Sequence, residues 1–167
     1  MRKIRLILCG AVVFIGTLVL QFNASAQQDV ATDQLSKPYN PDADAQDDIN
    51  RLLVQAKQER KNIIIQAGGN WCVWCLRFND YIHKTQSVDK LLKNSFLYYH
   101  LNYSKENKNE TVFQKYAPEG SKLGYPFFIV LDSNGKTLHV QESGSLEKGK
   151  WYDEEKVLNF LTAWVAE

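Results

Sequence analysis

Two cysteines stand three positions apart, directly after a short apolar run, and this arrangement constrains the fold most strongly. Residues 63–67 read Ile-Ile-Ile-Gln-Ala, and residues 68–70 read Gly-Gly-Asn. The first run is typical of a strand buried on both faces, and the second ends it. Cys72 and Cys75 follow at once, at the start of a helix expected to continue to about Thr85. An i, i+3 spacing places both sulfurs on one helical face, so we expect a strand, a turn and a helix that carries a close thiol pair.

The start of a helix is a favourable place for a reactive thiol. The unpaired backbone N–H groups there carry partial positive charge, which stabilises a thiolate and lowers the pKa of a cysteine below its free value of about 8.5. We therefore expect Cys72 to be exposed and reactive, and Cys75 to lie one turn deeper.

A cysteine pair at this spacing has three other known uses. A structural disulfide gains little from closing so short a loop. A zinc site needs two more ligands, and the candidates His83, His100 and His139 are scattered without a second paired motif. Covalent haem attachment needs a histidine directly after the second cysteine, where this chain has Leu76. A redox-active pair is the preferred interpretation, and no metal is expected.

The N-terminal segment has the pattern of a secretory signal. Arg2, Lys3 and Arg5 precede an apolar stretch, and residues 24–26 read Ala-Ser-Ala. We expect residues 1–26 to be a signal peptide cleaved after Ala26, which implies a periplasmic protein; an uncleaved membrane anchor is the alternative. Residues 27–40 are polar and are expected to form a linker, which leaves residues 41–167 as one domain.

Two helices outside the cysteine motif are also expected. The first begins at Pro41 with Asn40 as its cap, and several acidic residues follow in its first turn. The last extends roughly from Asp153 to Ala166 and carries apolar residues on one side. Between them, residues 141–151 are expected to form a long loop.

The motif and its surroundings resemble the thioredoxin-like family over roughly residues 45–166. Trp71-Cys72-Val73-Trp74-Cys75 is similar to the active-site signature of an exported bacterial branch. Residues 95–102, 111–116 and 124–131 look like the family's next central strand, a short helix, and the cis-proline loop with the strand it opens. Residues 132–135 form a hairpin turn that leads to a strand at 136–141. The resemblance implies an α/β thioredoxin fold with a central mixed sheet flanked by helices.

The resemblance also implies roles for individual residues. Cys72 attacks or releases the substrate sulfur, and Cys75 resolves the mixed disulfide. Pro126 is expected to be cis and to pack beside the disulfide, and the backbone of Tyr125 to pair with a bound substrate strand. Trp71 and Trp74 flank the thiols, and Trp74 in particular is expected to offer a surface for apolar substrate segments.

One position departs from the family pattern. A buried Asp that resembles a proton acceptor for the second cysteine is replaced by Gln66, and a neutral amide cannot take the proton. His100 is a partial substitute, although a histidine with its hydrogen bonds satisfied within the strand is the preferred interpretation.

The function expected from the sequence is that of an exported thiol–disulfide oxidoreductase. The full chain has 20 basic and 19 acidic residues, and loss of residues 1–26 leaves 17 against 19, which gives no electrostatic basis for nucleic-acid binding. We expect a monomer without metal, flavin or nucleotide, whose partners are exported client proteins with thiols or disulfides, with a membrane electron donor as a further candidate. The rival function is a non-catalytic binding module or chaperone that uses the same fold.

Overall fold

The structure, a computed structural model, describes residues 34–167. The expected signal peptide and residues 27–33 of the expected linker lie outside the described residues. In chain order the helices and strands are α1 (Ala45–Glu59), β1 (Asn62–Gly68), α2 (Val73–Lys84), α3 (Gln86–Ser95), β2 (Phe96–Asn102), α4 (Glu110–Tyr116), β3 (Phe127–Leu131), β4 (Thr137–Glu142), β5 (Glu147–Lys148), β6 (Trp151–Tyr152) and α5 (Glu154–Thr162).

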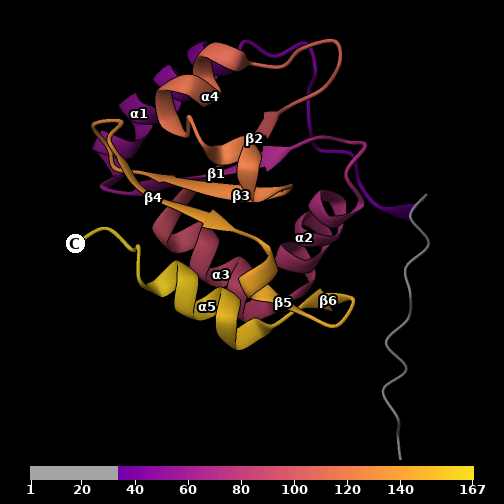
Figure 1. The fold of residues 1–167 in the computed structure, drawn as a ribbon. Helices are drawn as coiled ribbons and strands as arrows, with labels where there is room; N and C mark the ends of the chain where they lie inside the picture. Colours follow the sequence, from indigo (N-terminus) through magenta and orange to yellow (C-terminus); the bar gives the residue numbers. More distant parts are fainter. Residues whose placement is uncertain (1–33) are drawn as a thin grey trace, which may run out of the picture.

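Four strands form a mixed sheet at the centre of the molecule, in the order β2-β1-β3-β4 (Figure 1). β1 is parallel to β2 and antiparallel to β3, and β3 is antiparallel to β4. All seven residues of β1 and all five of β3 are buried, as expected for inner strands covered on both faces. The architecture is α/β, with the central mixed sheet and flanking helices that the sequence predicted.

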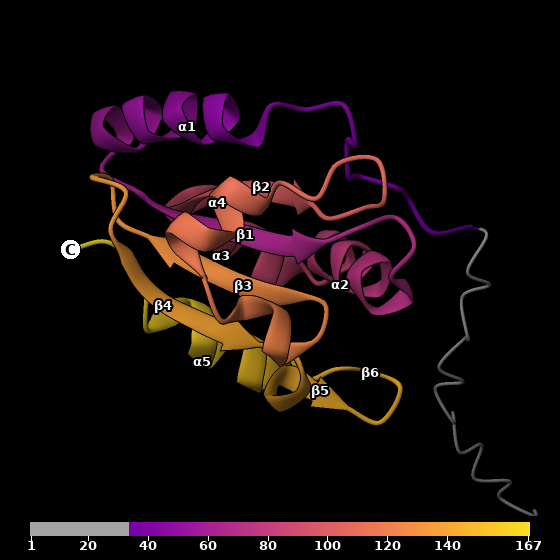
Figure 2. The same ribbon diagram turned by 45° about the horizontal axis from the view of Figure 1, so that its top comes forward.

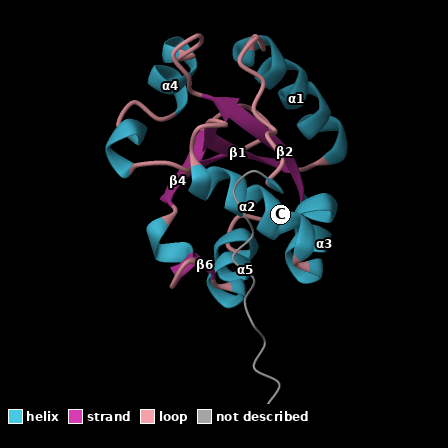
Figure 3. Ribbon diagram, turned by 90° about the vertical axis from the view of Figure 1, so that its right-hand side faces the viewer, coloured by secondary structure: helices cyan, strands magenta, loops and turns pink. Residues whose placement is uncertain are grey.

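Helices cover the two faces of the sheet unequally. α1 and α4 lie on one face, and α2, α3 and α5 lie on the other (Figures 1 and 3). Each face has its own apolar core: Ile63, Ile65 and Ile129 belong to the first, whereas Ile64 and Phe128 belong to the second. α2 follows the carboxyl end of β1 and packs on the second face of the sheet (Figure 2). The cysteine pair at the start of α2 therefore lies near that end of β1.

α1 begins four residues later than the sequence analysis placed it. The Asp44 side chain accepts a hydrogen bond from the backbone N–H of Asp47 and caps the helix. Asn40 instead accepts from the N–H of Asp42 and stabilises a turn before the helix. The prediction of Asn40 as the cap was wrong. Asp44 is an equally good capping residue, and it lies next to the stretch in which apolar residues recur at helical spacing.

The C-terminal part of the chain holds two further corrections. Residues 141–151 are not one long loop: they contain the end of β4, a 3₁₀ turn at Gly144–Leu146 and most of the β5–β6 hairpin. α5 ends at Thr162 rather than near Ala166. Trp164 lies beyond the helix, where its carbonyl accepts from Asn62 Nδ2 at 2.9 Å and its ring stacks on His139.

The described part of the expected linker packs on the domain. Residues 34–40 contain no strand or α-helix, yet Leu35 and Tyr39 are buried. The Asn79 Nδ2 atom donates to Ser36 Oγ at 3.3 Å, which joins this arm to α2. We refer to residues 34–40 as the N-terminal arm.

Candidate active site

Cys72 and Cys75 are joined by a disulfide at the start of α2. Cys72 is the N-cap of the helix, and its sulfur accepts a hydrogen bond from the Cys75 backbone N–H at 3.1 Å. Cys72 is 6% exposed and Cys75 is fully buried. The expected order of depth is therefore found, although Cys72 is much less exposed than the sequence analysis anticipated, because the arm and Tyr125 pack against it.

Gly68 leaves the space that the Cys75 sulfur occupies. A Cβ atom built on Gly68 would overlap the Cys75 sulfur and would lie 3.3 Å from Cys75 Cβ. The last residue of β1 must therefore lack a side chain for α2 to begin so close to the strand.

The loop before β3 faces the disulfide cluster. The peptide bond between Tyr125 and Pro126 is cis, and Pro126 is buried at the start of β3. Tyr125 packs against the cluster formed by Tyr39, Cys72 and Cys75. Burial raises the pKa of the Tyr125 hydroxyl to about 12, with a smaller contribution from Tyr103. This loop and the cysteine pair, which are 50 residues apart in sequence, come together as the resemblance implied.

An exposed aromatic surface borders the disulfide. Trp71 is 58% exposed, and its ring meets Tyr125 edge to face at 5.5 Å. Its Nε1 atom donates to the Tyr103 carbonyl at 2.7 Å, and Tyr103 stacks on Tyr125 at 5.4 Å. We call Trp71, Tyr103 and Tyr125 the aromatic surface.

Trp74 is placed differently from Trp71. It is half-buried, its ring meets Tyr152 edge to face at 5.7 Å, and the Arg77 guanidinium lies 5.1 Å from its centroid. The Tyr152 hydroxyl donates to the Trp74 carbonyl, which ties the β5–β6 hairpin to α2. The sequence analysis favoured Trp74 as the substrate-facing tryptophan, but Trp71 offers more accessible area.

Gln66 lies fully buried behind the cysteine pair, and both ends of its side-chain amide are used. Nε2 donates to the Cys75 carbonyl at 2.9 Å, and Oε1 accepts from the Tyr98 hydroxyl at 2.7 Å. Burial holds the pKa of Tyr98 well above its usual range, so the hydroxyl remains a donor. Gln66 thus joins β1 and β2 to the first turn of α2.

His100 lies on β2, opposite Gln66 of β1. The expectation that its hydrogen bonds are satisfied within the strand is wrong. Its Nε2 atom is buried without a hydrogen-bond partner, and its ring meets both Tyr39 and Tyr98 edge to face. The ring also borders a largely apolar cavity of about 350 Å³ beneath α2 and α3. Burial, with a smaller effect of His83, lowers the pKa of His100 to about 4, so the imidazole is neutral at pH 7.

Because the folded chain holds His100 neutral, we expect the stability of the protein to depend on pH. The unfolded chain takes up a proton at His100 near its usual pKa of about 6.5, whereas the folded chain does so only near pH 4. The free energy of unfolding is therefore at its full value above about pH 6.5, and it falls by about 1–3 kcal/mol as the pH drops to 4. Urea unfolding at several pH values should show this slope in the natural chain and a flatter one in His100→Gln. The His139→Gln control should keep the steeper slope; equal slopes for His100→Gln and the natural chain would contradict the assignment.

Tyr39 is the residue of this site that sequence reasoning missed. It is 2% exposed and belongs to the same cluster as the two cysteines. Residues 27–40 are mostly polar, which is typical of a linker, and for this reason no site role was predicted for Tyr39. The available signal was the apolar pair Leu35 and Tyr39, spaced four apart within that polar stretch.

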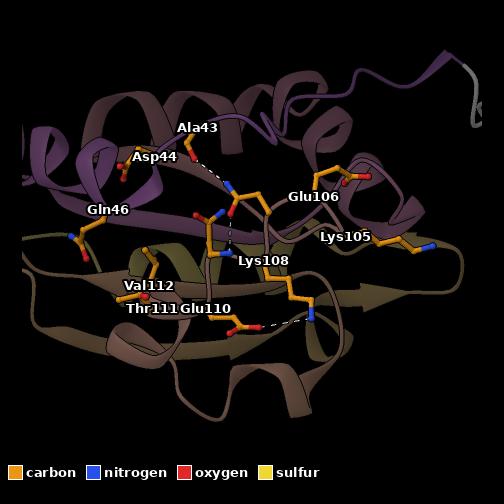
Figure 4. Close-up of a pocket in the computed structure, with 11 residues that line it drawn as sticks. Ala43, Asp44, Gln46, Lys105, Glu106, Lys108, Glu110, Thr111 and Val112 are labelled. Carbon is orange, nitrogen blue, oxygen red and sulfur yellow. Dashed lines mark hydrogen bonds and ion pairs between the residues drawn. The ribbon is translucent and has the colours of Figure 1, made fainter.

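A wide pocket lies away from the disulfide. It has a volume of about 700 Å³ and lies between the start of α1 and the loop before α4 (Figure 4). Asn107 Nδ2 donates to the carbonyls of Pro41 and Ala43 there, and Lys108 pairs loosely with Glu110 at 3.8 Å. Its polar groups thus serve mainly to fix the loop. Within residues 34–167 no three His, Cys, Asp or Glu side chains are grouped as metal ligands.

Comparison with solved structures shows a shared fold. The crystal structure of a disulphide isomerase from Xylella fastidiosa Temecula1 superposes with a TM-score of 0.67 at 22% sequence identity, covering 77% of this chain and 97% of that one. A thioredoxin-fold protein from Helicobacter pylori aligns at a TM-score of 0.40 and 21% identity, over 62% of this chain and 81% of that one, which is too loose to support an argument. No curated protein sequence matches this chain significantly.

The family assignment rests on sequence as well as on fold. Residues 44–133, more than half of the chain, match the family described as Thioredoxin-like. That span contains β1, the cysteine pair, α2 and the cis-proline loop with β3. The chain therefore belongs to the thioredoxin-like family.

Proposed function

We propose that this chain is an exported thiol–disulfide oxidoreductase that acts on protein cysteines through Cys72 and Cys75. The observation that carries the proposal is the Cys72–Cys75 disulfide at the start of α2, packed against the tyrosine of a cis-proline loop. The Cys72 sulfur already accepts a backbone N–H, and the same contact with a thiolate would be stronger because the acceptor is charged.

In the reductive direction the exchange has two steps. The Cys72 thiolate attacks a client disulfide, a Cys72–client bond forms, and the first client sulfur leaves as a thiolate. Cys75 then loses its proton to water and attacks the Cys72 sulfur, which forms the Cys72–Cys75 bond and expels the second client thiolate. Two electrons pass from the cysteine pair to the client. The oxidative direction reverses these steps, and the partner's reduction potential decides between them.

The client is proposed to bind across the disulfide. The backbone of Tyr125 pairs with an extended client segment, next to Pro126, and the aromatic surface contacts apolar client side chains. The 58% exposure of Trp71 supports this role, and the half-buried Trp74 contributes its remaining exposed area. Clients are exported proteins with thiols or disulfides, and a membrane electron donor completes the cycle if the protein works as a reductase.

The test of this function is insulin reduction by dithiothreitol. The natural chain should accelerate the reaction, and a Cys72→Ser, Cys75→Ser double variant should not. Equal rates of insulin reduction with the two proteins would contradict the proposed oxidoreductase function. Only the rival function would then remain, a binding module whose aromatic surface holds clients without turnover.

Export is the second part of the proposal, and the sequence of residues 1–26 supports it. Among the helices of residues 34–167, none has the length and apolar character needed to cross a bilayer. The mature protein should begin at Gln27 and leave cells with the periplasmic fraction. Recovery of the full-length chain only in detergent extracts would instead support a membrane anchor.

The difference in exposure of the cysteines predicts their order of alkylation. In the reduced protein, limiting iodoacetamide should label Cys72 first, because Cys75 is fully buried and Cys72 caps the helix. Mass mapping of the labelled peptides measures the order. Labelling that favours Cys75 would reverse the assignment of the nucleophile.

A further inference from the structure

A buried tyrosine hydroxyl lies beside the disulfide without a hydrogen-bond partner. Tyr39 is 2% exposed, and its Oη atom is buried and unpaired in the disulfide form. Leaving a buried hydroxyl unpaired is unfavourable, so such a group calls for an explanation. Tyr39 comes from the N-terminal arm, which the resemblance to the family does not cover.

This hydroxyl lies close to the Cys75 sulfur. A Cβ atom built on Gly68 would overlap that sulfur and would lie 2.9 Å from Tyr39 Oη. The two atoms therefore approach the same small space above the end of β1. The Tyr39 ring also packs in one cluster with Cys72 and Cys75.

The arm is attached directly to the segment that carries the cysteines. Asn70, two residues before Cys72, accepts from the Tyr39 backbone N–H at 3.1 Å and donates to the Tyr39 carbonyl at 2.7 Å. This two-bond contact holds the Tyr39 backbone as a neighbouring strand would. The two hydrogen bonds with Asn70 thus hold Tyr39, and with it the hydroxyl, beside the cysteine pair.

The other polar groups around the cysteine pair are less suited to interact with the Cys75 sulfur. Gln66 is near enough to the Tyr39 hydroxyl to lower its pKa against the larger effect of burial, but both ends of the Gln66 amide are used by Cys75 and Tyr98. His100 lies against the Tyr39 ring at 5.1 Å between centroids. Among the described residues, the titratable or charged side chains nearest this cluster are Tyr39, Tyr98, His100, Tyr125, Tyr152 and Arg77. Tyr103 stacks on Tyr125 and Glu147 lies near Tyr152, both further from the sulfurs. No carboxylate belongs to the cluster formed by Tyr39, Cys72 and Cys75.

We infer that Tyr39 Oη donates a hydrogen bond to the Cys75 sulfur once the disulfide is reduced, and thereby stabilises the Cys75 thiolate that resolves the mixed disulfide. The inference deepens the proposed function and rests on it. It also explains how a chain with Gln66 in place of the family's acid can carry out the second step. The hydroxyl that has no partner in the oxidised form gains one in the reduced form.

Tyr39 keeps its own proton throughout the step. Cys75 releases its proton to water, its sulfur attacks Cys72, the Cys72–client bond breaks, and the client thiolate leaves with the electron pair and takes a proton from water. Burial holds the pKa of Tyr39 well above its usual range, so the hydroxyl acts only as a hydrogen-bond donor. A donor to a charged sulfur favours the ionised form.

The test uses Tyr39→Phe and the aromatic disulfide dithiobis(nitrobenzoate). Attack by Cys72 of the reduced protein releases one coloured thiolate, and attack by Cys75 on the resulting mixed disulfide releases the second. Stopped-flow absorbance follows both. In Tyr39→Phe the second release should be about ten- to a hundredfold slower at pH 7, and its pH midpoint should rise by about 1–2 units. The first release should change less than about twofold.

Two further variants separate the hydroxyl from packing. Tyr116 also has a buried, unpaired hydroxyl but belongs to the core on the opposite face of the sheet, so Tyr116→Phe should leave both releases unchanged. Asn70→Ala should slow the second release in the same direction as Tyr39→Phe, because it frees the arm. The oxidised Tyr39→Phe protein should melt no earlier than the natural chain, since the variant removes an unpaired group.

The outcomes distinguish this inference from the proposed function. If the natural chain gives no second release, the resolving role of Cys75 fails. If the natural chain and Tyr39→Phe give the second release at the same rate and pH midpoint, only the role of Tyr39 is overturned.

Discussion

Cys75→Ser should accumulate covalent complexes with client proteins, whereas Cys72→Ser should form none. In the proposed exchange Cys72 makes the bond to the client and Cys75 breaks it, so loss of the second sulfur should stop the reaction at the mixed disulfide. Insulin reduction should fall by on the order of 10³-fold or more in either variant, because groups that act as a unit lose most activity when one is removed. Non-reducing gels of cells that express each variant, followed by mass spectrometry of the complexes, measure the trapping.

The double serine variant is the control for this prediction. It keeps the fold of the first turn of α2, because serine is also a favoured cap, but has no sulfur to trap a client. Complexes that form equally with Cys72→Ser would show that Cys75 also attacks clients, contrary to its full burial.

Gly68→Ala should destabilise the oxidised protein by about 1–3 kcal/mol, the usual range for added volume in a packed core. The new Cβ would overlap the Cys75 sulfur and lie 2.9 Å from Tyr39 Oη and 3.3 Å from Cys75 Cβ. β1 is buried along its whole length, and the disulfide holds the start of α2, so neither side can move away freely. In a chain of this size the Tm should fall by roughly 2–4 °C for each kcal/mol.

Gly144→Ala is the matched control for the added methyl group. Its Cβ would meet only the end of the Glu142 side chain, at 2.9 Å. That carboxylate accepts from the exposed Ser145 N–H, and its flexible side chain can shift while one oxygen keeps this bond. Its Tm should stay within about 2 °C of the natural value, in the range of a surface substitution. A Gly68→Ala protein as stable as the Gly144→Ala protein would contradict the close packing of Cys75 on β1.

The elements that could be predicted from sequence are those with strong local signals. β1 and β3 are runs of apolar, largely β-branched or aromatic residues bounded by Gly, Pro and Asp, and they were placed within one residue of their ends. α2 was placed by the cysteine motif and ended where expected, with Thr85 as its C-cap. The assembly of the cysteine pair with the Tyr125–Pro126 loop came from the family resemblance, because 50 residues separate them.

The elements that were missed have weak local signals or are placed by contacts with distant segments. α3 was not predicted, because its sequence is mostly polar and only Val88 and Leu92 are buried. The β5–β6 hairpin has strands of two residues, too short to show a period. Residues 27–40 have the composition of a linker, and the burial of Tyr39 follows from its two hydrogen bonds with Asn70, which lies 31 positions further along the chain.

Single-turnover exchange between the fully reduced protein and an oxidised client tests the central claim most directly. Equal amounts of reduced protein and insulin are mixed without dithiothreitol, quenched with acid at successive times, and mapped by mass spectrometry. The account predicts that one insulin disulfide is reduced for each Cys72–Cys75 disulfide formed, at the same rate, and that the double serine variant reduces none. Insulin reduction that leaves Cys72 and Cys75 as free thiols, or no reduction beyond that with the double serine variant, would contradict it.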